Sequence, residues 1–346
     1  MKATKKSLAI ILVLAMMIAT LGACGNSEPA ESEGEVGTTP EYTWTASCSN
    51  TEEHPAVQGM YKFAELMEEK SGGRIHMDVF HSAQLSSDRD SIEGMQMNTI
   101  QSSIMVTAPL AGFTGVFLPF DLPFLLDGNE EARAVCDSEV GQDMLVALEE
   151  IGMKGLGFME YGMRNTTNSK RPIETPADLV GIKIRTMENS VHMDAFRAMG
   201  ADPTPMAFGE LFTALQQKTI DAQENPLSVI TSSKFNECQT YLSMTEHLYS
   251  AAPLLVSKTA YDELPADLQA VVDEAGKEAC EWQREYSSEM EEQMLNDLIA
   301  AGMEVNYPDK APFIEAIASV YEKYVGDGAD QVSPAILEEI YSIIGR

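Results

Sequence analysis

Apolar and polar residues follow two alternating periods along the chain, and these periods predict alternating strands and helices. Residues 42–50, YTWTASCSN, have the threonine and aromatic content of a strand, and residues 54–73 space their apolar side chains as a helix that stops at a glycine pair. The succession continues with a strand at 74–80, a helix at 88–100 and a strand at 102–108. This rhythm predicts an α/β protein with a mostly parallel sheet and helices on both faces.

A predicted helix at 129–152 and a predicted strand at 154–162 come next, and a second cycle of the same kind then begins. It contains a strand at 181–186, a helix at 188–200, and a helix followed by a strand at 208–225, before a turn at Pro226. The repetition predicts two α/β lobes rather than one large sheet.

One predicted helix is unusually long. Residues 265–302 run from Pro265, a residue suited to a first turn, to Gly302, a residue suited to a stop. A helix of this length measures about 54 Å, which exceeds one small domain, so we expect it to lie across both lobes. A coiled-coil arm is the alternative, but the apolar residues hold no clean heptad.

The N-terminus has the features of an export signal. Lys2, Lys5 and Lys6 precede a short apolar run at 8–21, and LGAC follows, ending at Cys24. We therefore expect residues 1–23 to be a signal peptide and Cys24 to be lipidated, because LGAC resembles a bacterial lipobox; an ordinary signal peptide is the alternative. Residues 24–41 are acidic and lack apolar periodicity, which predicts a flexible tether that holds an exported domain at an outer membrane surface.

The net charge of the chain bears on which classes of partner it can bind. The formal net charge is −31, and without the lysines of the predicted leader the rest is more acidic still. Such a surface repels phosphate backbones, so we expect no nucleic-acid partner and a soluble monomer. Four further cysteines, Cys48, Cys136, Cys238 and Cys280, lie in no metal-binding spacing; they are either buried free thiols or partners in one of three disulfide pairings.

Motifs of enzymes and of cofactor or metal sites are missing. The sequence has no GxSxG, HExxH, Walker or GxGxxG motif, and its five histidines are scattered. We therefore predict no catalytic residue, metal or cofactor, and favour capture of a small molecule in a cleft between the lobes. An exported enzyme acting on carboxylates, a receptor for peptide or metal, and a sensor subunit are the rival interpretations.

Three polar residues come at the ends of predicted strands. Arg185 ends the strand GIKIRT, Arg164 follows the strand KGLGFMEYG, and Asn225 follows TIDAQ. Ligands of α/β sheets bind outside such strand ends, and a guanidinium binds a carboxylate through two parallel hydrogen bonds. On pattern alone, Arg185 could also be a solvent-facing strand residue, Arg164 could pair with an acid, and Asn225 could only stabilise the turn.

The segments around these residues resemble a known family. GMRNTTNSKRPI, TPADLVGIKIRTMEN, FRAMGADPTPMAFGELFTALQQ and TIDAQENPL are similar to the solute receptors of tripartite ATP-independent periplasmic (TRAP) transporters, and HPAVQGMYKFAEL, GGRIHMDVF and ELPADLQAVVDEA extend the similarity. The resemblance implies a periplasmic-binding-protein-like fold with two lobes, a hinge and a lobe-spanning helix. We expect lobe I at 42–161 and 251–285, and lobe II at 162–250 and 286–346.

The resemblance also implies roles for residues. Arg185 would clamp the carboxylate of an organic acid, Arg164 and Asn225 would assist, Phe208 would line the pocket, and a separate membrane permease would receive the ligand. The family often has an acid where Ser87 stands, which leaves the ligand open among sugar acids such as uronates, which we favour, C4-dicarboxylates and keto acids. Further candidates, each with a structural alternative, are Asn50, Ser87, Glu188, Asn189 and His247.

Overall fold

The structure of the protein is a computed structural model that describes residues 39–346. The predicted signal peptide, Cys24 and residues 24–38 of the predicted tether lie outside the described residues. Within the described range, no helix has the length and apolar character needed to cross a membrane. The four cysteines in this range are free thiols, and three of them are buried.

The described strands form one nine-stranded sheet with the order β2-β1-β3-β8-β4-β7-β5-β6, and β9 pairs with β8. At one end β1 pairs in parallel with β2 and β3, and at the other end β5 pairs in parallel with β6 and β7. The strands are Tyr42–Ser47 (β1), Ile75–Phe80 (β2), Ser102–Ile104 (β3), Met153–Asn168 (β4), Lys183–Thr186 (β5), Asp202–Pro205 (β6), Ala222–Pro226 (β7), Tyr241–Ser257 (β8) and Glu304–Asn306 (β9).

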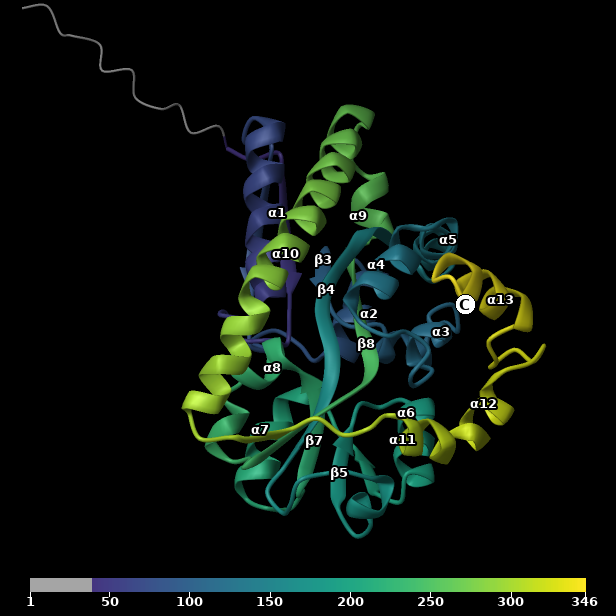
Figure 1. Cartoon of the computed structure of the whole chain (residues 1–346). Coiled ribbons are helices and arrows are strands. Elements are labelled where there is room, and N and C mark those ends of the chain that lie inside the picture. The colour runs from purple at the N-terminus through teal and green to yellow at the C-terminus, as the bar shows by residue number, and fades with distance from the viewer. Residues whose placement is uncertain (1–38) are drawn as a thin grey trace, which may run out of the picture. The chain divides into compact units, whose positions relative to one another are not determined.

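Two long antiparallel strands join the ends of the sheet. β4 has 16 residues and β8 has 17, and in Figure 1 they run from the group around β3 to the group around β7 and β5. The α/β class is confirmed, but the expectation that the lobes exclude one large sheet is wrong, because β4 and β8 continue through both groups. The residue boundaries given for the lobes stay a prediction.

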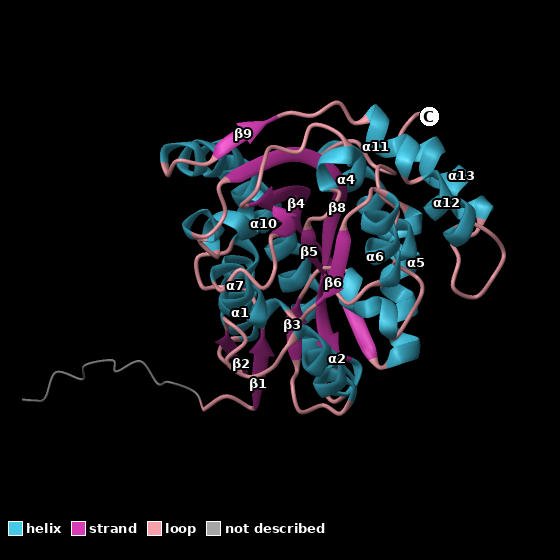
Figure 2. Ribbon diagram, turned by 90° about the horizontal axis from the view of Figure 1, so that it is seen from below, coloured by secondary structure: helices cyan, strands magenta, loops and turns pink. Residues whose placement is uncertain are grey.

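Helices cover both faces of this sheet. Figure 2 shows α1, α7 and α10 on one side of the strands and α5, α6, α12 and α13 on the other. The helix predicted at 129–152 divides in two at Ser138, whose hydroxyl accepts from the Gly141 amide. The α-helices are Pro55–Ser71 (α1), Asp88–Gln96 (α2), Leu118–Asp121 (α3), Asn129–Asp137 (α4), Glu139–Ala147 (α5), Ser190–Ala198 (α6), Phe208–Gln216 (α7), Leu227–Ser232 (α8), Lys258–Asp262 (α9), Ala266–Ala300 (α10), Ala311–Ala316 (α11), Ala318–Tyr324 (α12) and Pro334–Ile343 (α13).

Two apolar cores follow from this layering. Alternating strand residues point to opposite faces, so each face of the sheet buries its own set of side chains. Phe63 of α1 and Leu215 of α7 belong to one core, and Phe158 of β4 and Phe196 of α6 belong to the other. The cores fix the helices on the sheet and leave the ends of β5 and β7 free to carry polar residues.

The long helix α10 spans the strand groups as predicted. Its 35 residues begin after Pro265, and its end is followed by Gly302, whose φ of +96° suits glycine. It packs against α1, β4 and α8, so it is part of the domain and not a coiled-coil arm. At Gly276 a Cβ would lie 2.7 Å from Leu156 of β4, so this glycine permits the close approach of helix and strand.

Candidate functional site

Two adjoining cavities lie beside Arg185, Arg164 and Asn225, the residues predicted at strand ends; Arg164 lies within β4, which continues to Asn168, and not after a strand as predicted. The larger, which we call the outer cavity, has a volume of about 260 Å³, and the smaller, the inner cavity, about 30 Å³. Residues that line both come from several elements and are Ser49, Asp88, Arg185, Met187 and Phe208. Arg164, Asn225, Asn50 and Tyr161 line the inner cavity, whereas Ser87, Glu188 and Glu210 line the outer one. Seven of the nine predicted residues thus line the two cavities, and they come from β4, β5, β7, α7 and neighbouring loops.

Arg185 is a buried guanidinium that lacks an ion-pair partner among the described residues. It lies in β5 and is 3% exposed. Its Nε and Nη2 atoms both donate to the carbonyl oxygen of Met206, at 2.9 and 2.7 Å, whereas Nη1 donates to no atom of the described chain. Burial lowers the pKa of Arg185 to about 10, which leaves it charged at neutral pH. A desolvated cation with free donors at a cavity wall is suited to an anion.

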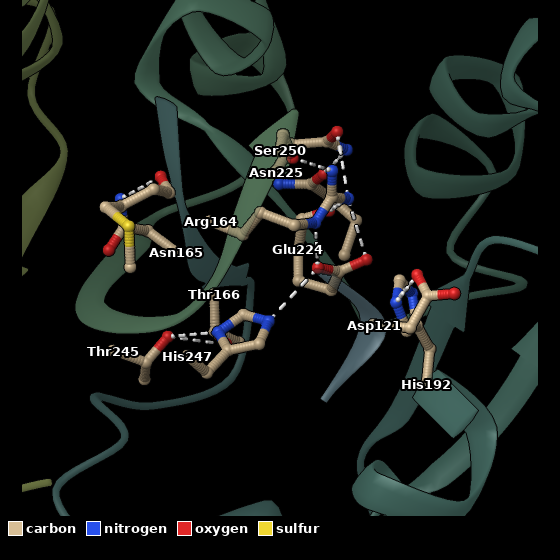
Figure 3. A network of polar contacts seen from close by, with 12 residues as sticks. Asp121, Arg164, Asn165, Thr166, His192, Glu224, Asn225, Thr245, His247 and Ser250 are labelled. Carbon is tan, nitrogen blue, oxygen red and sulfur yellow. Dashed lines mark hydrogen bonds and ion pairs between the residues drawn. The ribbon is translucent and has the colours of Figure 1, made fainter. Parts of the chain in front are cut away.

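Arg164, by contrast, already donates from its guanidinium atoms Nε and Nη2 to other groups of the protein. It lies in β4, is 2% exposed, and donates from Nε and Nη2 to the carboxylate of Glu224 in β7, with Nη2 2.8 Å from Oε1 (Figure 3). Nη1 donates to Ser250 at 3.0 Å, and Nη2 also reaches the Asn225 side-chain oxygen at 3.1 Å. The acid-pairing alternative therefore describes its main contact, and Nη1 keeps one N–H for the inner cavity.

A chain of hydrogen bonds from Thr245 through His247 reaches the Glu224 carboxylate. Burial would raise the pKa of Glu224, but the charge of Arg164 and the hydrogen bond from His247 outweigh it and hold this pKa below its usual range. Because a carboxylate only accepts, His247 donates from Nε2, 3.1 Å from Glu224 Oε2, and its Nδ1 accepts from the Thr245 hydroxyl at 2.8 Å. Burial lowers the pKa of His247 despite the nearby carboxylate, so it is neutral at neutral pH.

Three further predicted residues line the cavities in defined ways. The Asn225 side chain donates to Gln223 and accepts from Arg164. Asn50 is 5% exposed and accepts from the Tyr161 hydroxyl at 2.8 Å. Phe208 begins α7 and packs edge-on against Phe235, so its ring is held as one wall of the site.

Two predicted residues lie at the rim of the outer cavity. Ser87 caps α2 by accepting from the Asp90 amide, in a reciprocal capping box. Glu188 is exposed to solvent. The hydroxyl of Ser87 is thus partly committed to the helix, and Glu188 places a negative charge at the opening.

Two predicted residues line neither cavity. Asn189 caps α6, accepting from two amides, and its side chain donates to Asp121 at 2.9 Å. Asp121 also contacts His192 (Figure 3). His247 lies behind Glu224, to which it donates. The structure thus places both residues in the surrounding hydrogen-bond network, in line with the capping and structural alternatives.

Sequence reasoning missed three residues of the site. Asp88 lines both cavities, accepts from the Ser49 hydroxyl at 2.6 Å, and has a pKa raised by burial despite that bond and the charge of Arg185. Tyr161 lies inside the predicted strand at 154–162, and Glu224 lies between the predicted strand TIDAQ and Asn225. The position of Glu224 directly beside Asn225, at the end of the predicted strand TIDAQ, is a signal that could have found it.

The fold and the site define a class of protein. A family model, bacterial extracellular solute-binding protein, family 7, matches residues 46–327, and the chain belongs to this family. It is an extracytoplasmic solute receptor with the two-lobed fold of TRAP periplasmic solute-binding proteins, which confirms the resemblance seen in the sequence.

Three relatives are informative. The crystal structure of a TRAP solute-binding protein from Bordetella, with density assigned to pantoate, is 40% identical, with a TM-score of 0.82 over 86% of this chain and 98% of that one. One from Polaromonas, bound to D-erythronate, is 36% identical, with a TM-score of 0.82 over 88% and 98%. The 2,3-diketo-L-gulonate-binding periplasmic protein YiaO of Escherichia coli is 35% identical over 274 residues, 78% of this chain and 84% of that protein.

Proposed function

We propose that this receptor captures a hydroxylated monocarboxylate, a sugar acid in particular, and that Arg185 binds its carboxylate. The observation that carries the proposal is the buried guanidinium of Arg185, which has no carboxylate within 4.0 Å in the described structure although it is 3% exposed. Burying a charge that no carboxylate contacts is unfavourable, so a ligand anion that pairs with it gains both a hydrogen bond and relief of that cost.

The free atoms of the arginine indicate how the anion binds. The Nε–Nη2 edge is occupied by the Met206 carbonyl, so the ligand carboxylate approaches the side of Nη1. Arg164 assists with the N–H of Nη1 that Ser250 leaves free, and Asn225 holds Arg164 in the inner wall. Phe208 contributes an apolar surface beside them.

The remaining charges of the cavities favour hydroxyl groups over a second carboxylate. Asp88, Glu188 and Glu210 line the outer cavity, and its other cation, Arg89, already pairs with Glu93. Carboxylates accept hydrogen bonds from ligand hydroxyls but repel a second anionic group. The three relatives' ligands, pantoate, D-erythronate and 2,3-diketo-L-gulonate, are acids that carry hydroxyl or oxo groups, which supports a sugar acid over a C4-dicarboxylate.

The receptor then passes its ligand to a membrane partner. Contacts from both strand groups favour closure of the lobes around the acid by a hinge motion, and the closed form delivers it to a TRAP-type permease. A lipid on Cys24 and a tether over 24–41 would keep the monomeric receptor near that permease. This part of the proposal rests on the family and on the N-terminal sequence.

Calorimetry and thermal shift of the purified protein test the ligand proposal. We expect aldonates or uronates to bind stoichiometrically without product, and to stabilise the protein more than succinate or pyruvate. Arg185→Ala should weaken binding by about 100-fold or more, whereas Arg197→Ala, an exposed arginine outside the cavities, should bind as the wild type does. A loss below about threefold for Arg185→Ala in folded protein would contradict the proposal, and turnover would favour the enzyme alternative.

A further inference from the structure

One edge of β4 is covered by a helix in place of a strand. β4 pairs with β8 along its length, but on its other side pairing with β7 begins only at Arg164. Before that point, two side chains of α10 form hydrogen bonds with main-chain groups on this unpaired edge. Arg284 donates from Nε to the Phe158 carbonyl at 2.8 Å, and the Gln283 side chain donates to the Glu160 carbonyl. An unpaired strand edge needs such partners because buried main-chain groups must be hydrogen-bonded.

Through its side chain, Gln283 makes with Glu160 the two main-chain hydrogen bonds that a neighbouring strand would otherwise make. Its Oε1 accepts from the Glu160 amide at 2.8 Å, and its Nε2 donates to the Glu160 carbonyl at 2.7 Å. Its side chain is fully buried in the middle of α10, where an uncommitted polar group would be unfavourable. Both main-chain groups of Glu160 are therefore held by one amide, which fixes the local path of the strand.

Glu160 comes directly before a β-bulge, and this bulge orients the Tyr161 side chain towards the ligand site. The register between β4 and β8 shifts between Glu160 and Gly162, and Gly162 has a φ of +102°. Tyr161 is the extra residue: its hydroxyl donates to Asn50, its carbonyl accepts from Ser228, and its ring lines the inner cavity. The orientation of Tyr161, and through it of Asn50, thus depends on the backbone that Gln283 holds.

We propose that Gln283 is a positioning residue for the ligand site: from α10 it holds the bulge of β4 so that Tyr161 and Asn50 face the ligand. The effect on affinity rests on the proposed function, whereas the effect on the bulge does not. Gln283 is far along the chain from the cavities and lines neither of them, so its influence on binding passes through Tyr161.

The test compares two neighbouring residues of α10 that both bond to β4. Gln283→Met should weaken binding of D-erythronate, or of the sugar acid that binds the wild type best, by about tenfold in calorimetry. Arg284→Met removes the bond to Phe158, upstream of the bulge, and should leave affinity within about twofold. In amide hydrogen exchange of the ligand-free protein, residues 160–162 should exchange faster in the Gln283 variant than in the Arg284 variant.

A double-mutant cycle separates positioning from general destabilisation. In a Tyr161→Phe background, which lacks the bond to Asn50, Gln283→Met should cost less than about twofold in affinity. A full tenfold loss in that background, equal losses for the Gln283 and Arg284 variants, or unchanged exchange at 160–162 would each overturn the inference. Gln283→Asn, which withdraws the amide by one methylene, replaces the Met variant if that variant does not fold. Failure of the wild type to bind any acid would refute the proposed function, and hydrogen exchange would still decide the role of Gln283.

Discussion

Two buried arginines, Arg164 and Arg185, line the same inner cavity and differ in their hydrogen-bond and ion-pair partners within the protein. Arg164 is 2% exposed and Arg185 is 3% exposed, and both line the small cavity between the strand groups. Arg164 has the carboxylate of Glu224 on its Nε–Nη2 edge, whereas Arg185 has a single carbonyl oxygen there. The two arginines are therefore equally buried, but only Arg164 is in direct contact with a carboxylate, whereas Glu224, Asp88 and Glu188 act on Arg185 from a longer distance.

This difference assigns separate tasks to the two side chains. A buried ion pair with satisfied hydrogen bonds holds its elements in place, and here it joins β4 to β7. A buried cation with free donors is prepared for an anion that arrives later. We infer that Arg164 supports the site and that Arg185 receives the ligand, and substitutions at and around the two arginines would separate or merge these roles.

The largest effect is expected from Arg164→Met. The substitution leaves the Glu224 carboxylate buried without its cation, which should lower the free energy of unfolding by about 3–5 kcal/mol. Urea denaturation of the ligand-free protein measures this loss. Glu224→Gln in the same variant should recover part of it, because the uncompensated charge is then absent; no recovery would show that Arg164 stabilises the fold through packing alone.

The local elements of this fold could be predicted from the sequence, whereas the shared sheet could not. The helical spacing of residues 54–73 and the Pro265 and Gly302 boundaries of α10 are read from neighbours along the chain. The pairing of β4 with β8 joins residues 73 to 104 positions apart and includes three register shifts, which no local period encodes. The number of lobes could therefore be predicted, but not that two strands continue through both.

The candidate site shows the same division. The strand-end rule led to Arg185, Arg164 and Asn225, which line one cavity, although Arg164 lies within β4 and not at its end. Whether an arginine already has a carboxylate depends on a residue from another strand, as with Glu224, which lies 60 positions from Arg164. The sequence could thus identify both arginines but not which of them is free.

His247 tests the support behind Arg164. His247→Asn keeps a polar group near Thr245 but cannot reach Glu224, and loss of a hydrogen bond to a carboxylate should cost about 2 kcal/mol of unfolding free energy. His247→Gln places an amide donor close to the position of Nε2 and should recover about half. Urea denaturation of both variants measures the difference, and equal stability of the two would mean that the bond to Glu224 contributes little.

A substitution of Asp88 tests how the negative charge beside Arg185 affects ligand selectivity. Asp88→Asn removes a negative charge from both cavities, so affinity for a dicarboxylate such as succinate should rise about tenfold relative to a sugar acid. Because burial raises the pKa of Asp88, its charge is lost at a higher pH than that of an ordinary aspartate. In the wild type, relative affinity for the dicarboxylate should therefore increase as the pH falls towards that raised pKa. Calorimetry across this pH range should show no such trend in the Asn variant, and a trend in both proteins would assign the titration to another group.

The smallest effect, and the closest counterpart to Arg164→Met, is expected from Arg185→Met in the absence of ligand. The substitution removes a desolvated charge that has no carboxylate partner, although it also leaves the Met206 carbonyl without its two donors. The unfolding free energy should therefore stay unchanged or rise by up to about 1 kcal/mol. Urea denaturation measures this value, and thermal shift with the bound sugar acid should show that the stabilisation by ligand is lost. If Arg185→Met instead destabilised the ligand-free protein by several kcal/mol, as Arg164→Met should, both arginines would be structural and the carboxylate would have to bind elsewhere.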